Sequence, residues 1–151
     1  MTSNPLHFRK LESMYLSAPI NKIHFPSTAI EISDGSSIIT INLDESYHHT
    51  ARAGHGSVYF KLLDDASFFA ANSKQPNYFV LTQSFALDFI KPIFEGKLTA
   101  IGKFIKEEAG KFYAESELFN NQNELVGKGS GVFAISKIPL NSIPEYQETV
   151  K

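Results

Sequence analysis

The residues best suited to chemistry lie in and just before one long apolar segment. Asp64 stands between Phe60 and Phe68, four residues away on either side. Loss of water around such a carboxylate disfavours its charged form and raises its pKa, as a general base working near neutral pH requires. Residues 54–56, Gly-His-Gly, precede this segment. Free N–H groups at the start of a helix there could stabilise an oxyanion, and glycine would allow close approach.

The segment 55–73 predicts one long central helix, because its nineteen residues contain no proline and glycine only near the start. At about 100° per residue, apolar side chains occupy both sides of this helix, so it should be buried nearly all round. A sheet can cover one side. A second subunit is the simplest cover for Phe60 and Phe68 on the other side, and we therefore predict a homodimer.

The other elements predict a single α+β domain, 1–151, whose antiparallel sheet wraps around the central helix. A shorter helix is expected within residues 1–19, with Asn4 as N-cap, Pro5 at the first helical position and Pro19 at its end. Two prolines and mixed charge predict a loosely held tail over 139–151. Strands joined by consecutive hairpins are expected over 28–33, 37–43, 78–90, 98–106, 111–119 and 125–135.

Composition excludes several classes of function. Fourteen Lys and Arg against sixteen Asp and Glu give a net charge of −2 with no basic run, so we expect no nucleic-acid partner. The absence of cysteine excludes disulfides, thiolate zinc sites and a cysteine nucleophile. No apolar stretch approaches the ~20 residues that span a bilayer, and the N-terminus lacks an apolar segment of signal-peptide type. We expect a soluble, cytoplasmic protein without a membrane partner.

A cluster of histidines raises the question of a metal. His48, His49 and His55 lie close to Asp44 in the sequence. No His-Glu-x-x-His helix and no cysteine accompanies them, so we predict no metal site. His55 is more simply interpreted as a helix cap.

The segment around residue 55 also resembles a known family. Gly54-His55-Gly56-Ser57, with Asp64 nine residues after the histidine, is similar to the motif of hotdog-fold thioesterases of the phenylacetate-degradation (PaaI) type. That motif reads His-Gly-Gly, six residues, then an acidic residue inside the central helix. The segments 82–96 and 127–133 resemble two later strands of the same family. Together the similar segments span residues 20–135 in the expected order, which implies a hotdog fold.

The resemblance implies hydrolysis of an acyl-CoA or related acyl thioester by a homodimer, or by a dimer of dimers. No cofactor is implied, since CoA is part of the substrate. In the family pattern the Gly56 N–H binds the thioester carbonyl, Asp64 acts as general base or nucleophile, and Thr82 binds the attacking water or the carboxylate.

Two departures from the family pattern affect this prediction. Ser57 replaces the second glycine of the motif, and His49 stands where relatives commonly have an asparagine that helps to hold the carbonyl. A histidine donor would bring its own titration to that position. The predicted catalytic residues are Asp64, Gly56, Thr82 and His49, and the predicted substrate-binding residues are His55, Ser57, Phe60 and Phe68.

Helix geometry links catalysis to the dimer. Eight residues separate Gly56 from Asp64, which is ~12 Å along a helix. Groups acting on one carbonyl and its attacking water lie within about 3 Å of one another. If both residues serve one carbonyl, they must come from different subunits.

Other interpretations stay open at this stage. Asp64 could form an ion pair with Lys61, although Asp65, four residues after Lys61, suits that pairing better. Thr82 alone is only a residue that favours strands. The protein could also be a non-catalytic acyl-CoA-binding hotdog module, or a hotdog dehydratase acting on hydroxyacyl thioesters.

Overall fold

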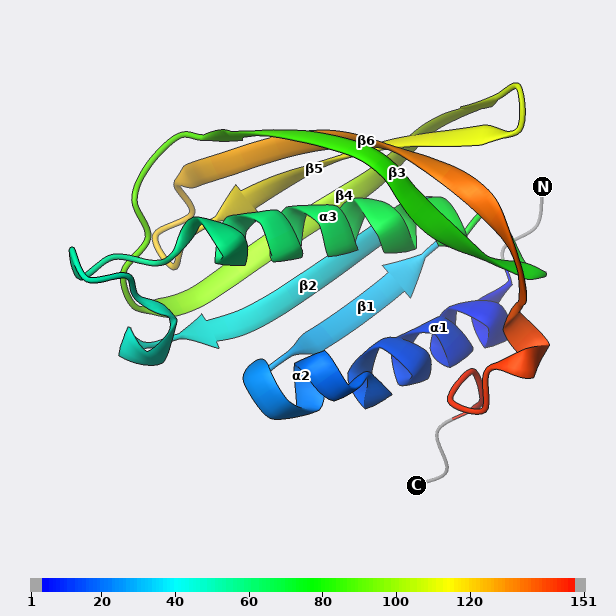
Figure 1. Cartoon of the computed structure of the whole chain (residues 1–151), viewed down its shortest axis with the longest axis horizontal. Coiled ribbons are helices and arrows are strands. Elements are labelled where there is room, and N and C mark those ends of the chain that lie inside the picture. The colour runs from blue at the N-terminus through cyan, green and yellow to red at the C-terminus, as the bar shows by residue number, and fades with distance from the viewer. Residues whose placement is uncertain (1–3, 149–151) are drawn as a thin grey trace.

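The computed structural model describes residues 4–148 and confirms an α+β fold in which one antiparallel sheet curves around a long helix (Figure 1). That helix, α3, spans Gly56–Asn72 and was expected over 55–73. The remaining elements are α1 (Pro5–Ser17), α2 (Pro19–His24), β1 (Ala29–Ser33), β2 (Ser36–Leu43), the 3-10 helix η1 (Glu45–Tyr47), β3 (Tyr78–Phe89), β4 (Gly96–Glu108), β5 (Lys111–Phe119), β6 (Leu125–Pro139) and the 3-10 helix η2 (Leu140–Ser142).

The N-terminal region contains two helices rather than the single helix predicted within residues 1–19, of which residues 1–3 lie outside the described part. The Asn4 side chain accepts the His7 N–H at 3.3 Å and so caps α1. Pro19 was expected only to end this helix, yet it also begins α2. Ala18 between them has an extended backbone, and proline is well suited to the first position of a new helix. The chain therefore turns a corner at Ala18.

The sheet order is β1-β2-β4-β5-β6-β3. The expectation of consecutive hairpins is wrong for one connection, because β3 pairs with β6 and not with β4, which follows it in the sequence. Both edges of β4 are already occupied, one by β2 and the other by β5. As a result β3 is an edge strand, paired along one side only within this chain.

Helix α3 is seated on the sheet at a few close polar contacts. A Cβ atom on Gly102 of β4 would lie 2.0 Å from the Ala66 carbonyl oxygen, so only glycine allows the helix to come this near. Two buried hydroxyls donate to the same face of the helix, Ser37 to Ala66 O at 2.6 Å and Ser116 to Leu63 O at 2.7 Å. These contacts fix the rotation of α3 about its axis and thereby decide which side chains face away from the sheet.

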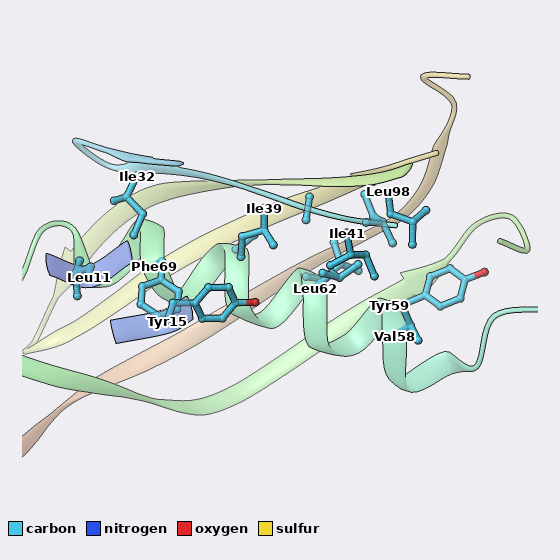
Figure 2. Close-up of a cluster of buried hydrophobic side chains, with 14 of the residues drawn as sticks. Leu11, Tyr15, Ile32, Ile39, Ile41, Val58, Tyr59, Leu62, Phe69 and Leu98 are labelled. Carbon is cyan, nitrogen blue, oxygen red and sulfur yellow. The ribbon is translucent and has the colours of Figure 1, made fainter. Parts of the chain in front are cut away.

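The core lies between α3 and the sheet, with α1 closing it beside β1 (Figures 1 and 2). Leu62 on α3 is fully buried, and so is Leu11 on α1. No helix in the described part of the chain has the length and hydropathy to span a bilayer. Other buried side chains of this core are Tyr15, Ile32, Ile39, Ile41, Val58, Tyr59, Phe69 and Leu98.

The segment after Pro139 is not the loosely held tail predicted for 139–151, at least as far as residue 148. Leu140 and Tyr146 are 1% and 9% exposed. The Tyr146 hydroxyl lies 2.5 Å from His7 Nδ1, and His7 Nε2 donates to the Asn72 carbonyl at 2.8 Å. A neutral histidine thus ties the C-terminal segment to α1 and to the end of α3. Residues 149–151 of the predicted tail lie outside the described residues.

Candidate active site

Asp64 and Thr82 are brought together from two elements. Asp64 lies on the side of α3 that faces away from the core, and Thr82 lies on the edge strand β3. The Thr82 hydroxyl donates to Asp64 Oδ1 at 2.9 Å. The second carboxylate oxygen, Oδ2, accepts no hydrogen bond from any described residue. One oxygen is therefore held in place while the other is free to take a proton.

The environment of Asp64 raises the pKa of its carboxyl from 3.8 to about 6. Burial is the largest cause, because it removes water from the charged form. The hydrogen bond from Thr82 opposes this rise, the nearby Asp65 adds to it, and Lys61 counteracts it weakly. The carboxylate is therefore ionised at neutral pH and considerably more basic than an ordinary aspartate.

Lys61 is engaged elsewhere, as the spacing of Asp65 predicted. Its ammonium group donates to Asp65 Oδ2 at 2.7 Å and to the Tyr15 hydroxyl at 3.1 Å. Tyr15 in turn donates to the same Asp65 oxygen at 2.7 Å. The interpretation of Asp64 as an ion-pair partner of Lys61 is thus wrong, and within residues 4–148 Asp64 has no salt bridge.

The two phenylalanines that flank Asp64 behave differently. Phe60 is 42% exposed and packs edge to face on Phe85 of β3. Phe68 was expected to need a second subunit as cover, but it is half-buried within its own chain. Its ring lies 5.2 Å from that of Phe79 and 5.9 Å from that of Phe133. Only Phe60 leaves a large apolar surface in water on this side of the helix.

The N-terminus of α3 carries the glycine motif. His55 is the N-cap, and its Nδ1 accepts the Ser57 N–H at 3.0 Å, which confirms its predicted capping role. The Ser57 hydroxyl lies 2.8 Å from the same ring nitrogen. Val58 N–H donates to the His55 carbonyl, whereas no described residue accepts the Gly56 N–H. Gly56 therefore offers a free donor at the positive end of the helix dipole.

His49 lies in the loop that precedes α3, apart from the pair formed by Asp64 and Thr82. Its Nδ1 accepts the Ala51 N–H at 3.1 Å, and it lines a separate, polar hollow. His48 donates to the Phe94 carbonyl at 2.6 Å. Among residues 4–148 no three or more potential ligands gather as a metal site would require.

An apolar cavity of about 710 Å³ lies beside Asp64 and Thr82. Its size falls within the range of small-molecule sites. The sequence singled out Asp64, Thr82 and Phe68, which line this cavity, but did not indicate the cavity itself. Its walls come from α1, α2, α3, β3 and the segment after η2, and no local pattern indicates that these distant segments meet. The lining residues beyond the pair are mainly apolar, among them Met14, Ile20, Phe68, Phe69, Phe79, Leu81 and Ile143.

The sequence matches the thioesterase superfamily model over residues 37–126, more than half of the chain. The chain belongs to the thioesterase superfamily. No curated protein matches it by sequence. The matched region contains both Asp64 and Thr82, together with the Gly56 motif at the start of α3.

Several solved structures share the fold of this chain. The Escherichia coli PaaI protein, from the phenylacetic acid degradation operon, superimposes with a TM-score of 0.77 at 21% identity, covering 89% of this chain and 98% of its own. Zebrafish thioesterase superfamily member 2 gives 0.75 at 12% identity, with 87% and 99% covered. A Streptococcus mutans protein bound to acetyl-CoA gives 0.66 at 16% identity, with 72% and 88% covered. At these identities the likeness establishes the hotdog fold.

Proposed function

We propose that this member of the thioesterase superfamily hydrolyses an acyl-CoA at sites shared by two subunits. The observation that carries the proposal is the pair of Asp64 and Thr82 on the wall of an apolar cavity. A carboxylate with a pKa of about 6 and one unpartnered oxygen suits a general base near neutral pH. Membership of the thioesterase superfamily and the acetyl-CoA bound to a structural relative support the choice of substrate.

In the proposed reaction a water molecule beside Asp64 attacks the thioester carbonyl carbon. Asp64 takes one proton from the water as the C–O bond forms, and the carbonyl oxygen becomes an oxyanion. When the tetrahedral intermediate collapses, the C–S bond breaks and the proton on Asp64 passes to the departing sulfur. The products are a carboxylic acid and the free CoA thiol, and Asp64 returns to its starting state.

The oxyanion requires donors that Asp64's own helix end cannot provide. Gly56 and Asp64 occupy one unbroken helix, so eight residues place them ~12 Å apart. In the proposed dimer the N–H of Gly56 of the partner subunit binds the oxyanion. His55 and Ser57 stay predicted contacts of the thioester end of the substrate, and His49 stays a predicted additional donor from the same loop.

The free edge of the sheet is the proposed dimer contact. Strand β3 pairs on one side only, and a second copy could continue the sheet there. Phe60, Leu81 and Phe89 on or beside this edge are 42%, 48% and 59% exposed. Apolar side chains gathered beside an unpaired strand are typical of an interface between subunits.

Thioester hydrolysis is tested by measuring the release of free CoA thiol from a panel of acyl-CoAs. Asp64→Asn should lower turnover by about 10²- to 10⁴-fold, the usual contribution of a general base. Asp34→Asn is the matched control, since Asp34 pairs with Lys74 and does not line the cavity. Saturable binding of acyl-CoA without thiol release by the wild-type protein would instead support a non-catalytic binding module.

The shared site is tested by complementation. Gly56→Pro removes the N–H at the first helical position, where proline is favoured, and the extended backbone of His55 is compatible with a following proline. Mixed dimers of this variant with Asp64→Asn contain one intact site of two. Random mixing of two inactive variants should therefore restore about a quarter of wild-type activity. No recovery in verified mixed dimers would contradict the shared site.

A further inference from the structure

The cavity beside Asp64 is bounded by segments that lie outside the region matched by the family. The chain corner at Ala18 and the first turn of α2 form one wall, with Ile20 at its rim. Ile143 and Glu145, which follow η2, form another. Both walls fall outside residues 37–126, whereas the remaining lining comes from α3 and β3, inside that stretch.

These walls are held in place by buried polar contacts. The Asn21 side chain donates to the Tyr15 carbonyl at 2.8 Å, which fixes α2 against α1. His7 links Tyr146 to the end of α3 and so fixes the segment that carries Ile143. Because both walls are tied to the core, the cavity is present before any ligand binds. Binding free energy is therefore not lost to ordering it.

The chemistry of the lining defines what fits. Most of the surface is contributed by aliphatic and aromatic side chains, including Met14, Phe79 and Leu81. The charged groups on it, Asp64, Asp65 and Glu145, are all carboxylates. No Lys or Arg lines the cavity among the described residues, and Lys61 beside it is bound to Asp65. An apolar group gains from burial here, whereas a carboxylate would meet negative charge without a free partner.

We propose that this cavity receives the acyl group of the substrate, and that it selects uncharged, apolar acyl groups larger than acetyl. This inference rests on the proposed thioesterase function, since it places the thioester carbonyl at Asp64 and the acyl chain beyond it. Ile20 and Ile143 limit the length of the chain, and Glu145 excludes a terminal carboxylate.

Binding of S-alkyl-CoA thioethers, which cannot be hydrolysed, tests the cavity independently of catalysis. Calorimetric titration of the wild-type protein with S-ethyl-, S-butyl-, S-hexyl- and S-octyl-CoA should show affinity rising by up to about fourfold per added CH₂ until the cavity is filled. Affinity that does not change with alkyl length would overturn the proposal.

A pair of tryptophan variants on α2 provides the matched comparison. Ile20 and Ile23 are both exposed, at 53% and 69%, so replacing either should not disturb folding. Only Ile20 lines the cavity. Ile20→Trp should weaken S-octyl-CoA binding at least tenfold while leaving S-ethyl-CoA within about twofold, and Ile23→Trp should change neither. Equal effects of both variants would refute the assignment.

The proposed exclusion of charged acyl groups is tested with S-(7-carboxyheptyl)-CoA, which carries a carboxylate on a chain similar to that of S-octyl-CoA. The wild-type protein should bind it at least tenfold more weakly, and Glu145→Gln should narrow this gap without affecting S-octyl-CoA. Equal affinity of the wild-type protein for the two ligands would refute the exclusion of charged acyl groups.

Failure of the proposed function can be distinguished from failure of this inference. If no acyl-CoA is hydrolysed but S-octyl-CoA binding keeps its sensitivity to Ile20→Trp, the cavity assignment stands and the hydrolase proposal fails. If thiol is released only from short acyl-CoAs, and Ile20→Trp does not change S-octyl-CoA binding, the hydrolase proposal stands and the cavity assignment fails.

Discussion

Replacing Asp64 with asparagine should lower turnover severely and at the same time stabilise the fold. The substitution keeps the shape of the side chain and an oxygen that can accept the Thr82 hydroxyl. It removes the negative charge, whose cost in this environment is visible in the rise of the Asp64 pKa from 3.8 to about 6. A residue that serves catalysis at the expense of stability would show this combination.

The magnitude follows from linkage between protonation and folding. Each pH unit of difference between the folded and unfolded pKa corresponds to about 1.4 kcal/mol, so the full effect would be about 3 kcal/mol. Asp64 is only half-buried, and solvent screening reduces this to about 1–2 kcal/mol. The variant should therefore melt about 3–6 °C above the wild-type protein at pH 8.

The pH dependence identifies the cause. Below pH 3.8 both folded and unfolded Asp64 are protonated, so its raised pKa does not lower the unfolding free energy. Above pH 6 both states are ionised, and the reduction in unfolding free energy reaches its full size. The stability difference between Asp64→Asn and wild type should thus open between pH 4 and pH 6. Denaturant unfolding at fixed protein concentration across this range measures it. A variant that is less stable than wild type at pH 8, or whose difference does not depend on pH, would refute the reasoning.

Three further outcomes are expected. The pH profile of kcat/KM should rise with a midpoint near 6, and Thr82→Val should move that midpoint upward because the hydroxyl lowers the Asp64 pKa, whereas Thr82→Ser should leave it in place. Gly102→Ala should cost about 3 kcal/mol or more in denaturant unfolding because its Cβ would meet α3, whereas Gly110→Ala, at a positive φ with open space around it, should cost about 1 kcal/mol. Burial lowers the His7 pKa below 6.5, so the unfolding free energy should fall as pH drops below 6.5, where only the unfolded chain takes up the proton. His7→Gln, measured in the Asp64→Asn background, should flatten this fall, and an unchanged slope would contradict it.

Sequence reasoning located the parts of the fold that depend on local pattern. The long apolar run predicted α3 to within one residue at each end, and β5 was predicted at its observed bounds. The contact between Thr82 and Asp64 was anticipated through the family resemblance, since eighteen residues separate them and no periodicity connects a strand residue with a helix residue.

The features that escaped prediction depend on distant segments meeting. The pairing of β3 with β6 is set by which edges β2 and β5 leave free, which composition does not reveal. Pro19 at the start of α2 is locally indistinguishable from a proline that only ends a helix. The burial of Tyr146 depends on His7, 139 residues away. The cavity beside Asp64 depends on all three of these non-local features, and for the same reason the sequence did not indicate it.

The proposed general base and part of the cavity wall come from different parts of the chain, and this has an evolutionary consequence. This base, Asp64, lies within the stretch that matches the superfamily model, while part of the open cavity beside it is lined by residues within 14–21 and by Ile143 and Glu145. Under the proposed acyl assignment, exchange or remodelling of those flanks would alter acyl preference without touching the helix that carries Asp64. Diversification of specificity in such a scaffold can therefore proceed from the periphery inward, with the chemistry left intact.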